Sequence, residues 1–156
     1  MNPVAASLAV VALVIVATLI GVVWRATTGR VRRTASGSVV TSAALETDAV
    51  FGDAATIVQF STEFCGPCRN AERVLTAVAA ERDGVAFVHV DLTTRPQVAH
   101  RFAVLQTPTI LLLDAAGGIR SRIGGVPRAQ EVGARLDEIA RGDTEDSAEE
   151  SHVGSR

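Results

Sequence analysis

The longest apolar stretch of the chain lies near its beginning. From Val4 to Val23 no residue carries a charge, and Ser7 and Thr18 are the only polar side chains in the run. As a helix, about 20 residues rise about 30 Å, which matches the hydrocarbon core of a bilayer. We therefore expect residues 1–24 to form an uncleaved transmembrane anchor that ends at Trp24, a residue suited to the membrane interface. A cleaved signal peptide is the alternative, although no basic residue precedes the run and no clean cleavage site follows it.

Polar segments flank the remaining patterned region. Residues 25–38 are rich in Gly, Ser, Thr and Arg, which predicts a linker that either contacts anionic lipid headgroups or is simply solvated. Residues 142–156 are acidic and polar, which predicts a disordered tail. Residues 39–141 lie between these segments and have the length of one ordinary domain.

Within residues 39–141 the hydrophobic period alternates between strand and helix. The segment Ala54–Phe60 is mostly apolar, which predicts a buried strand, and apolar side chains recur at helical spacing over Pro67–Arg82. Val85–Val90 is expected to be a second central strand, buried on both faces, which completes a βαβ unit. The other expected elements are an edge strand at Val39–Val40, a short helix near Leu45–Val50, a helix over Pro96–Phe102 capped by Thr93 or Thr94, a strand over Thr109–Leu113, a hairpin turn at Asp114–Gly118, a strand over Ile119–Ile123 and an amphipathic helix over Arg128–Arg141.

Both cysteines lie where the strand ending at Phe60 gives way to a helix. Cys65 and Cys68 enclose Gly66 and Pro67 in a Cys-Gly-Pro-Cys sequence. At a helix start, unpaired backbone N–H groups and the positive end of the helix dipole favour the thiolate, which is the reactive form. Pro67 is tolerated in the first turn, and Gly66 lets a partner chain approach closely. We expect Cys65 to attack a partner disulfide and the deeper Cys68 to resolve the mixed disulfide.

Two other roles for the cysteine pair are less consistent with the sequence. A structural disulfide would gain little stability from closing so short a loop. A closed zinc site needs four ligands, and only His89, His100 and His152 remain to supply nitrogen donors. The spacing from Cys68 to His89 and His100 does not match a zinc finger, so no metal is expected. The formal net charge of −2 suggests no nucleic-acid partner.

The segment from Val58 to Cys68 resembles the active-site segment of the thioredoxin family, and Thr107-Pro108-Thr109 before an apolar strand resembles a second motif of that family. The resemblance covers roughly Val39 to Arg141. It implies an α/β thioredoxin fold, in which helices flank a central mixed β-sheet. It also implies that Pro108 is a cis-proline and that Thr107 pairs with the client backbone. Gly124 and Gly125 are expected to border the substrate groove.

The same resemblance implies an activity. It implies reduction of disulfide-containing client proteins by the Cys65–Cys68 pair, with no cofactor beyond this redox-active disulfide. Electrons would come from a thioredoxin reductase or a membrane electron carrier.

Four residues depart from the family pattern near the cysteines, and one of them is Ser61, which stands where a second Trp is common. Gln59 replaces a usual buried Asp that acts as a base for the second cysteine, and Gln cannot ionise. His89 replaces a common Lys, and three roles are open to it. It can form a neutral hydrogen-bonded pair with Gln59, it can replace the missing base, or it can be an ordinary, partly buried strand residue. Phe64 replaces a usual Trp, and its stacking over the thiol is expected to survive.

The sequence thus predicts a membrane-tethered thiol–disulfide oxidoreductase. The alternatives are an extracytoplasmic thiol reductase or isomerase, for example in cytochrome c maturation, and a non-catalytic redox-sensing binding module. Arginines follow the apolar segment and no Arg or Lys precedes it, so the positive-inside rule favours a single-pass protein with a cytoplasmic domain. An extracytoplasmic domain remains the alternative.

Overall fold

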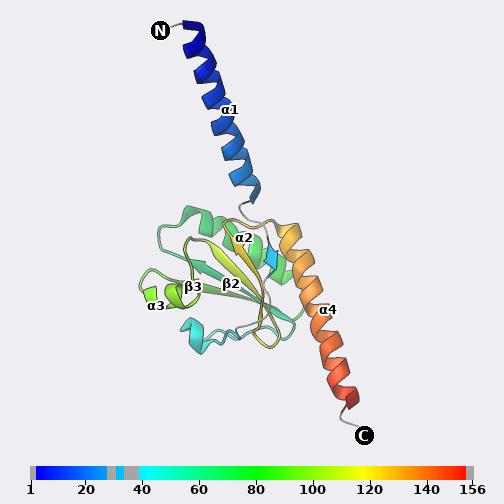
Figure 1. Cartoon of the computed structure of the whole chain (residues 1–156). Helices are drawn as coiled ribbons and strands as arrows, with labels where there is room; N and C mark the ends of the chain where they lie inside the picture. Colours follow the sequence, from blue (N-terminus) through cyan, green and yellow to red (C-terminus); the bar gives the residue numbers. More distant parts are fainter. Residues whose placement is uncertain (1–2, 28–30, 34–38, 154–156) are drawn as a thin grey trace.

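The computed structural model describes residues 3–27, 31–33 and 39–153. Figure 1 shows a central sheet with helices packed around it and the helix nearest the N-terminus extending away from the sheet. The elements are α1 (Pro3–Thr27), β1 (Arg32–Arg33), the 3₁₀ turn η1 (Ala43–Leu45), β2 (Ala55–Ser61), α2 (Gly66–Ala80), β3 (Val85–Asp91), α3 (Pro96–Arg101), β4 (Thr109–Asp114), β5 (Ile119–Gly124) and α4 (Ala129–Val153).

The strands form one mixed sheet in the order β1-β5-β4-β2-β3. Strand β2 pairs in parallel with β3 and antiparallel with β4, so it lies inside the sheet and all of its residues are buried. This position explains why β2 is mostly apolar and confirms the predicted buried strand. The predicted mixed sheet flanked by helices is also confirmed.

Strand β3 lies at the edge of the sheet, so the prediction of a second central strand buried on both faces is wrong. Val88 and Val90 are buried, whereas His89 and Asp91 are exposed. The apolar residues of β3 pack toward the sheet's two cores, but its outer edge has no neighbouring strand within the described chain. An apolar run therefore did not distinguish a covered edge strand from a central one.

Two hydrophobic cores lie on opposite faces of the sheet, because successive strand residues point to opposite sides. On one face, Ile57 and Ile110 pack with Leu75 of α2 and Leu136 of α4. The other face is covered by α3 and by the segment around η1. Gln59 lies two residues after Ile57 in the strand, so its side chain is on the same face of the sheet. It therefore faces α2, where the cysteines lie.

Two predicted segments near the ends of the domain differ in the structure. The strand expected at Val39–Val40 is reduced to one bridge between Val39 and Gly118, and the strand beside β5 is Arg32–Arg33, within the predicted linker 25–38. A two-residue strand is too short to show a hydrophobic period. Residues 28–30 and 34–38 of that linker lie outside the described residues.

The last helix is longer than predicted. Helix α4 continues past Arg141 to Val153, so the tail predicted as disordered over 142–156 is helical as far as the description extends. Glu145, Glu149 and Glu150 recur in this segment and favour helix, whereas the prediction was based on its acidic and polar composition. Val132, Leu136 and Ile139 are buried, as the amphipathic pattern predicted.

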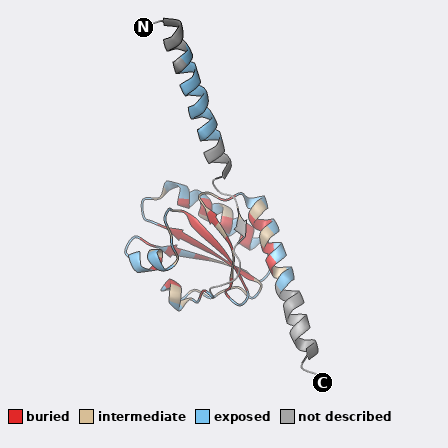
Figure 2. Cartoon of the chain, in the orientation of Figure 1, coloured by how far each residue is buried: buried red, intermediate tan, exposed pale blue. Residues whose placement is uncertain are grey.

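Helix α1 extends away from the sheet, and its described apolar side chains are exposed (Figures 1 and 2). Among the residues that the structure describes, no helix combines the length and apolar character that a membrane span needs. The transmembrane anchor over residues 1–24 therefore stays a prediction.

Shortening a core side chain of α2 should destabilise the domain. Leu75 is fully buried between α2 and the sheet, so we expect Leu75→Ala to lower the free energy of unfolding by about 2–5 kcal/mol. Val50 is 85% exposed, and Val50→Ala as a matched control should change it by less than about 0.5 kcal/mol. Urea unfolding followed by circular dichroism measures both, and equal losses would contradict the assignment of this core.

Candidate functional site

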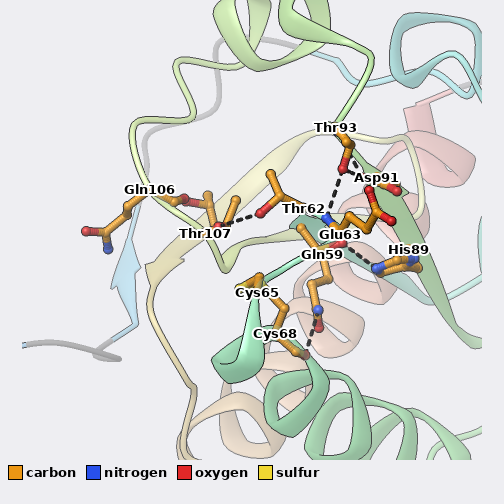
Figure 3. The surroundings of a disulfide bond; sticks show 12 residues. Gln59, Thr62, Glu63, Cys65, Cys68, His89, Asp91, Thr93, Gln106 and Thr107 are labelled. Carbon is orange, nitrogen blue, oxygen red and sulfur yellow. Dashed lines mark hydrogen bonds between the residues drawn. A yellow bond between two sulfur atoms is a disulfide. The ribbon is translucent and has the colours of Figure 1, made fainter.

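The cysteines form a disulfide at the start of α2 (Figure 3). Cys65 is the N-cap residue, Pro67 lies in the first turn as predicted, and the Cys68 N–H donates a 3.1 Å hydrogen bond to the Cys65 carbonyl oxygen. Cys68 is 4% exposed, whereas Cys65 is partly exposed. A second molecule can therefore reach the sulfur of Cys65 more readily than that of Cys68.

The surface beside Cys65 is open. Gly66 and Pro67 are exposed, and a Cβ atom built on Gly66 would have no neighbour within 4 Å. Phe64 is 91% exposed, so its ring does not cover the sulfur atoms and the expected stacking is wrong. The ring of Phe64 instead presents apolar surface to solvent next to the disulfide.

The predicted groove residues come together at the start of β4 and the end of β5. The Thr107–Pro108 peptide bond is cis, as the resemblance implied. Gly124 pairs with Thr109, and the Gly125 N–H donates a 2.8 Å hydrogen bond to the Pro108 carbonyl oxygen. Gly125 has a φ of 90°, a left-handed conformation that favours glycine.

Gln106 lies against Gly124, one of the predicted groove residues, and sequence reasoning missed it. A Cβ atom on Gly124 would collide with the side-chain amide of Gln106, so a glycine at 124 leaves room for this side chain. The Gln106 carbonyl oxygen also accepts a 2.8 Å hydrogen bond from the Thr109 hydroxyl. The position next to the Thr-Pro-Thr motif was the available sequence signal.

Gln59 is fully buried beneath the first turn of α2. Its Nε2 donates a 3.0 Å hydrogen bond to the Cys68 carbonyl oxygen, and within the described part of the chain its Oε1 has no hydrogen-bond partner. A neutral amide thus supports the turn that contains the buried cysteine. The orphaned oxygen is an acceptor but, unlike a carboxylate, cannot take up a proton at neutral pH.

His89 lies directly across from Gln59 in the β2–β3 register but does not hydrogen-bond to it. Its Nε2 lies 2.5 Å from the hydroxyl oxygen of Ser61, while the Gln59 amide turns to α2. The predicted Gln59–His89 pair is therefore wrong. Among the described residues, no group of three or more His, Cys, Asp or Glu side chains is placed to hold a metal, and the absence of a metal stays a prediction.

Thr93 was predicted to cap α3, and it has another role. The N-cap of α3 is Arg95, without a side-chain capping bond, so capping by Thr93 or Thr94 is wrong. The hydroxyl of Thr93 contacts the backbone of Glu63, in the loop before Cys65. Its sequence signal was Asp91 two positions earlier, because an Asp side chain often accepts the N–H two residues on.

Known proteins are similar to this chain over its folded domain. The family model described as thioredoxin matches residues 38–138. The thioredoxin of Mycobacterium tuberculosis H37Rv is 30% identical over 91 residues, which are 58% of this chain and 78% of that protein. The thioredoxin of Porphyra purpurea is 27% identical over 95 residues, 60% and 89% of the two chains. Among solved structures, chloroplastic thioredoxin z shares 29% identity at a TM-score of 0.51, over 56% of this chain and 79% of that one.

A carboxylate at position 59 should speed resolution of the mixed disulfide, the step in which Cys68 attacks the Cys65 sulfur. We expect Gln59→Asp to raise the rate of mixed-disulfide resolution by about tenfold at neutral pH, because it supplies a buried base. The variant should also be less stable, since a buried carboxylate is costly to ionise. Stopped-flow reduction of a client disulfide measures the rate.

The matched control is Gln59→Leu, which supplies no base and should give no gain. An unchanged rate in Gln59→Asp would contradict the prediction. It would mean that another group or water already accepts this proton, and His89→Ala would test the nearest imidazole.

Proposed function

Because the chain belongs to the thioredoxin family, we propose that its Cys65–Cys68 pair reduces disulfides in client proteins. The observation that carries this proposal is the asymmetric disulfide at the N-terminus of α2, with one cysteine partly exposed and the other buried. A disulfide that only stabilised the fold would need neither a partly exposed cysteine nor a cis-proline on the neighbouring loop.

The reaction proceeds by two thiol–disulfide exchanges. The Cys65 thiolate attacks one client sulfur, forms a mixed disulfide and releases the other client sulfur as a thiolate. The Cys68 thiolate then attacks the Cys65 sulfur, which restores the Cys65–Cys68 disulfide and releases the second client thiolate. Two electrons pass to the client, and the client thiolates take protons from water.

The surrounding residues assist binding and geometry. Thr107 and Pro108 offer a backbone edge next to Cys65 on which an extended client segment can pair in β fashion. Gly124 and Gly125 keep the neighbouring strand end free of side chains. Gln59 holds the turn of Cys68 through its carbonyl oxygen.

A thioredoxin reductase is the proposed electron donor. A relative from Mycobacterium leprae, 29% identical over 91 residues, is named a bifunctional thioredoxin reductase/thioredoxin. A membrane electron carrier is the alternative donor, and reoxidation of reduced protein with each candidate distinguishes them.

We also propose that α1 anchors the domain in a membrane, with the domain on the cytoplasmic side. The uncharged run Val4–Val23 and the exposed apolar side chains of α1, such as Leu13 at 70%, support an apolar environment for this helix. The arginines that follow the run support the cytoplasmic side.

The two cysteines should behave differently when one is removed. We expect Cys68→Ser to accumulate mixed disulfides with client proteins, because the resolving sulfur is missing, and Cys65→Ser to accumulate none. Non-reducing gels after acid quenching measure the trapped species. Equal alkylation rates of both thiols in the reduced wild type would argue against this assignment, and failure to reduce insulin disulfides would favour a binding module over an enzyme.

The side of the membrane can be tested in intact cells. After mild reduction, a membrane-impermeant maleimide should label Cys65 only when the cells are lysed, because a cytoplasmic domain is shielded. Labelling without lysis would place the domain outside. A protein recovered wholly in the soluble fraction would instead contradict the anchor.

A further inference from the structure

The loop that leads into Cys65 is held by a threonine from the β3–α3 connection. The Glu63 N–H donates a 2.8 Å hydrogen bond to Thr93 Oγ1, and the Thr93 hydroxyl donates a 2.6 Å hydrogen bond to Asp91 Oδ1. The Thr93 backbone N–H also donates to Asp91 Oδ1, at 2.9 Å (Figure 3). One hydroxyl therefore connects the end of β3 to the backbone two residues before the attacking cysteine.

A hydroxyl group suits this position because it donates and accepts at the same time. The Asp91 carboxylate only accepts, so it draws the hydroxyl proton to itself and leaves the Thr93 oxygen free to accept from Glu63. The hydrogen bonds from the hydroxyl and the N–H of Thr93 lower the pKa of the Asp91 carboxyl, which is therefore ionised at neutral pH. Asp91 and Thr93 together form a fixed acceptor for one loop amide.

On its other side, the same loop lies beside Thr107, which precedes the cis-proline. The hydroxyls of Thr62 and Thr107 lie 3.4 Å apart, and the Cys65 N–H donates a 3.2 Å hydrogen bond to the Thr62 carbonyl oxygen. Residues 62–65 thus form a turn fixed by Thr93 on one side and adjacent to the cis-proline loop on the other. These side-chain hydrogen bonds are exposed to solvent, so each adds little net stability.

We propose that Thr93 is a positioning residue of the redox site. By holding the Glu63 amide, it keeps Cys65 at the N-cap position of α2, near the positive end of the helix, and keeps Thr62 beside Thr107. The inference rests on the proposed function for its consequence in client reduction. Release of the loop would let the Cys65 sulfur leave the positive end of the helix, which makes the thiolate less favourable.

Three substitutions test the proposal in the reduced full-length chain with Cys68→Ser, which leaves a single thiol. Thr93→Val removes the hydroxyl at similar shape, Thr93→Ser keeps it, and Thr94→Val alters the exposed neighbouring threonine as a matched control. The measurement is the alkylation rate of Cys65 by iodoacetamide as a function of pH. We expect Thr93→Val to slow alkylation at neutral pH by about fivefold and to move the profile to higher pH. Thr93→Ser and Thr94→Val should stay within about twofold of the parent.

A profile of folded Thr93→Val that superimposes on the parent would overturn the positioning role. If Thr93→Val does not fold, Asp91→Ala is the second variant, because it removes the exposed carboxylate that orients the hydroxyl. Asp91→Ala must shift the alkylation profile in the same direction. An unchanged profile in Asp91→Ala overturns the positioning role as well. Faster hydrogen exchange of the Glu63 amide in either variant supports it. Alkylation needs no client, so a wild type that reduces no client disulfide would refute the proposed function while the profiles still decide the role of Thr93.

Discussion

The packing of α2 against the sheet determines where the redox sulfurs lie. Leu75 and Val78 of α2 share a core with Ile57 of β2, and four residues connect the strand to the helix. A close-packed core leaves little freedom for either element. The N-cap position of Cys65, its exposure, and the burial of Cys68 all follow from contacts that are made well below the reactive surface.

The elements of the fold that depend on residues close together in the sequence were predictable. The apolar run of β2, the helical spacing of Ala71, Leu75 and Val78, and the hairpin between β4 and β5 produce local patterns, and the structure has each of them. The cysteine pair and Thr107-Pro108 were recognisable as motifs. Family resemblance, rather than hydrophobic period, supplied the expectation that these distant motifs meet in one site.

The parts that depend on distant neighbours were not predictable. Nothing local tells whether His89 turns to Gln59 or to Ser61, because both lie within reach on the same face of the sheet. The sequence does not tell whether a phenylalanine ring such as that of Phe64 is exposed or packed against other side chains. Thr93 looked like a helix cap because its true partner, the Glu63 amide, is 30 positions away and a backbone group has no sequence signature.

The pairing of β1 with β5 has a consequence for how far the redox site can reach from α1. Arg32 pairs with Arg122 of β5 in the sheet, and four residues separate it from Thr27, the last residue of α1. Fully extended, this connection spans about 17 Å. If α1 is held in a membrane, as proposed above, so short a connection keeps the domain close to the bilayer surface, and client proteins must come to the membrane to be reduced.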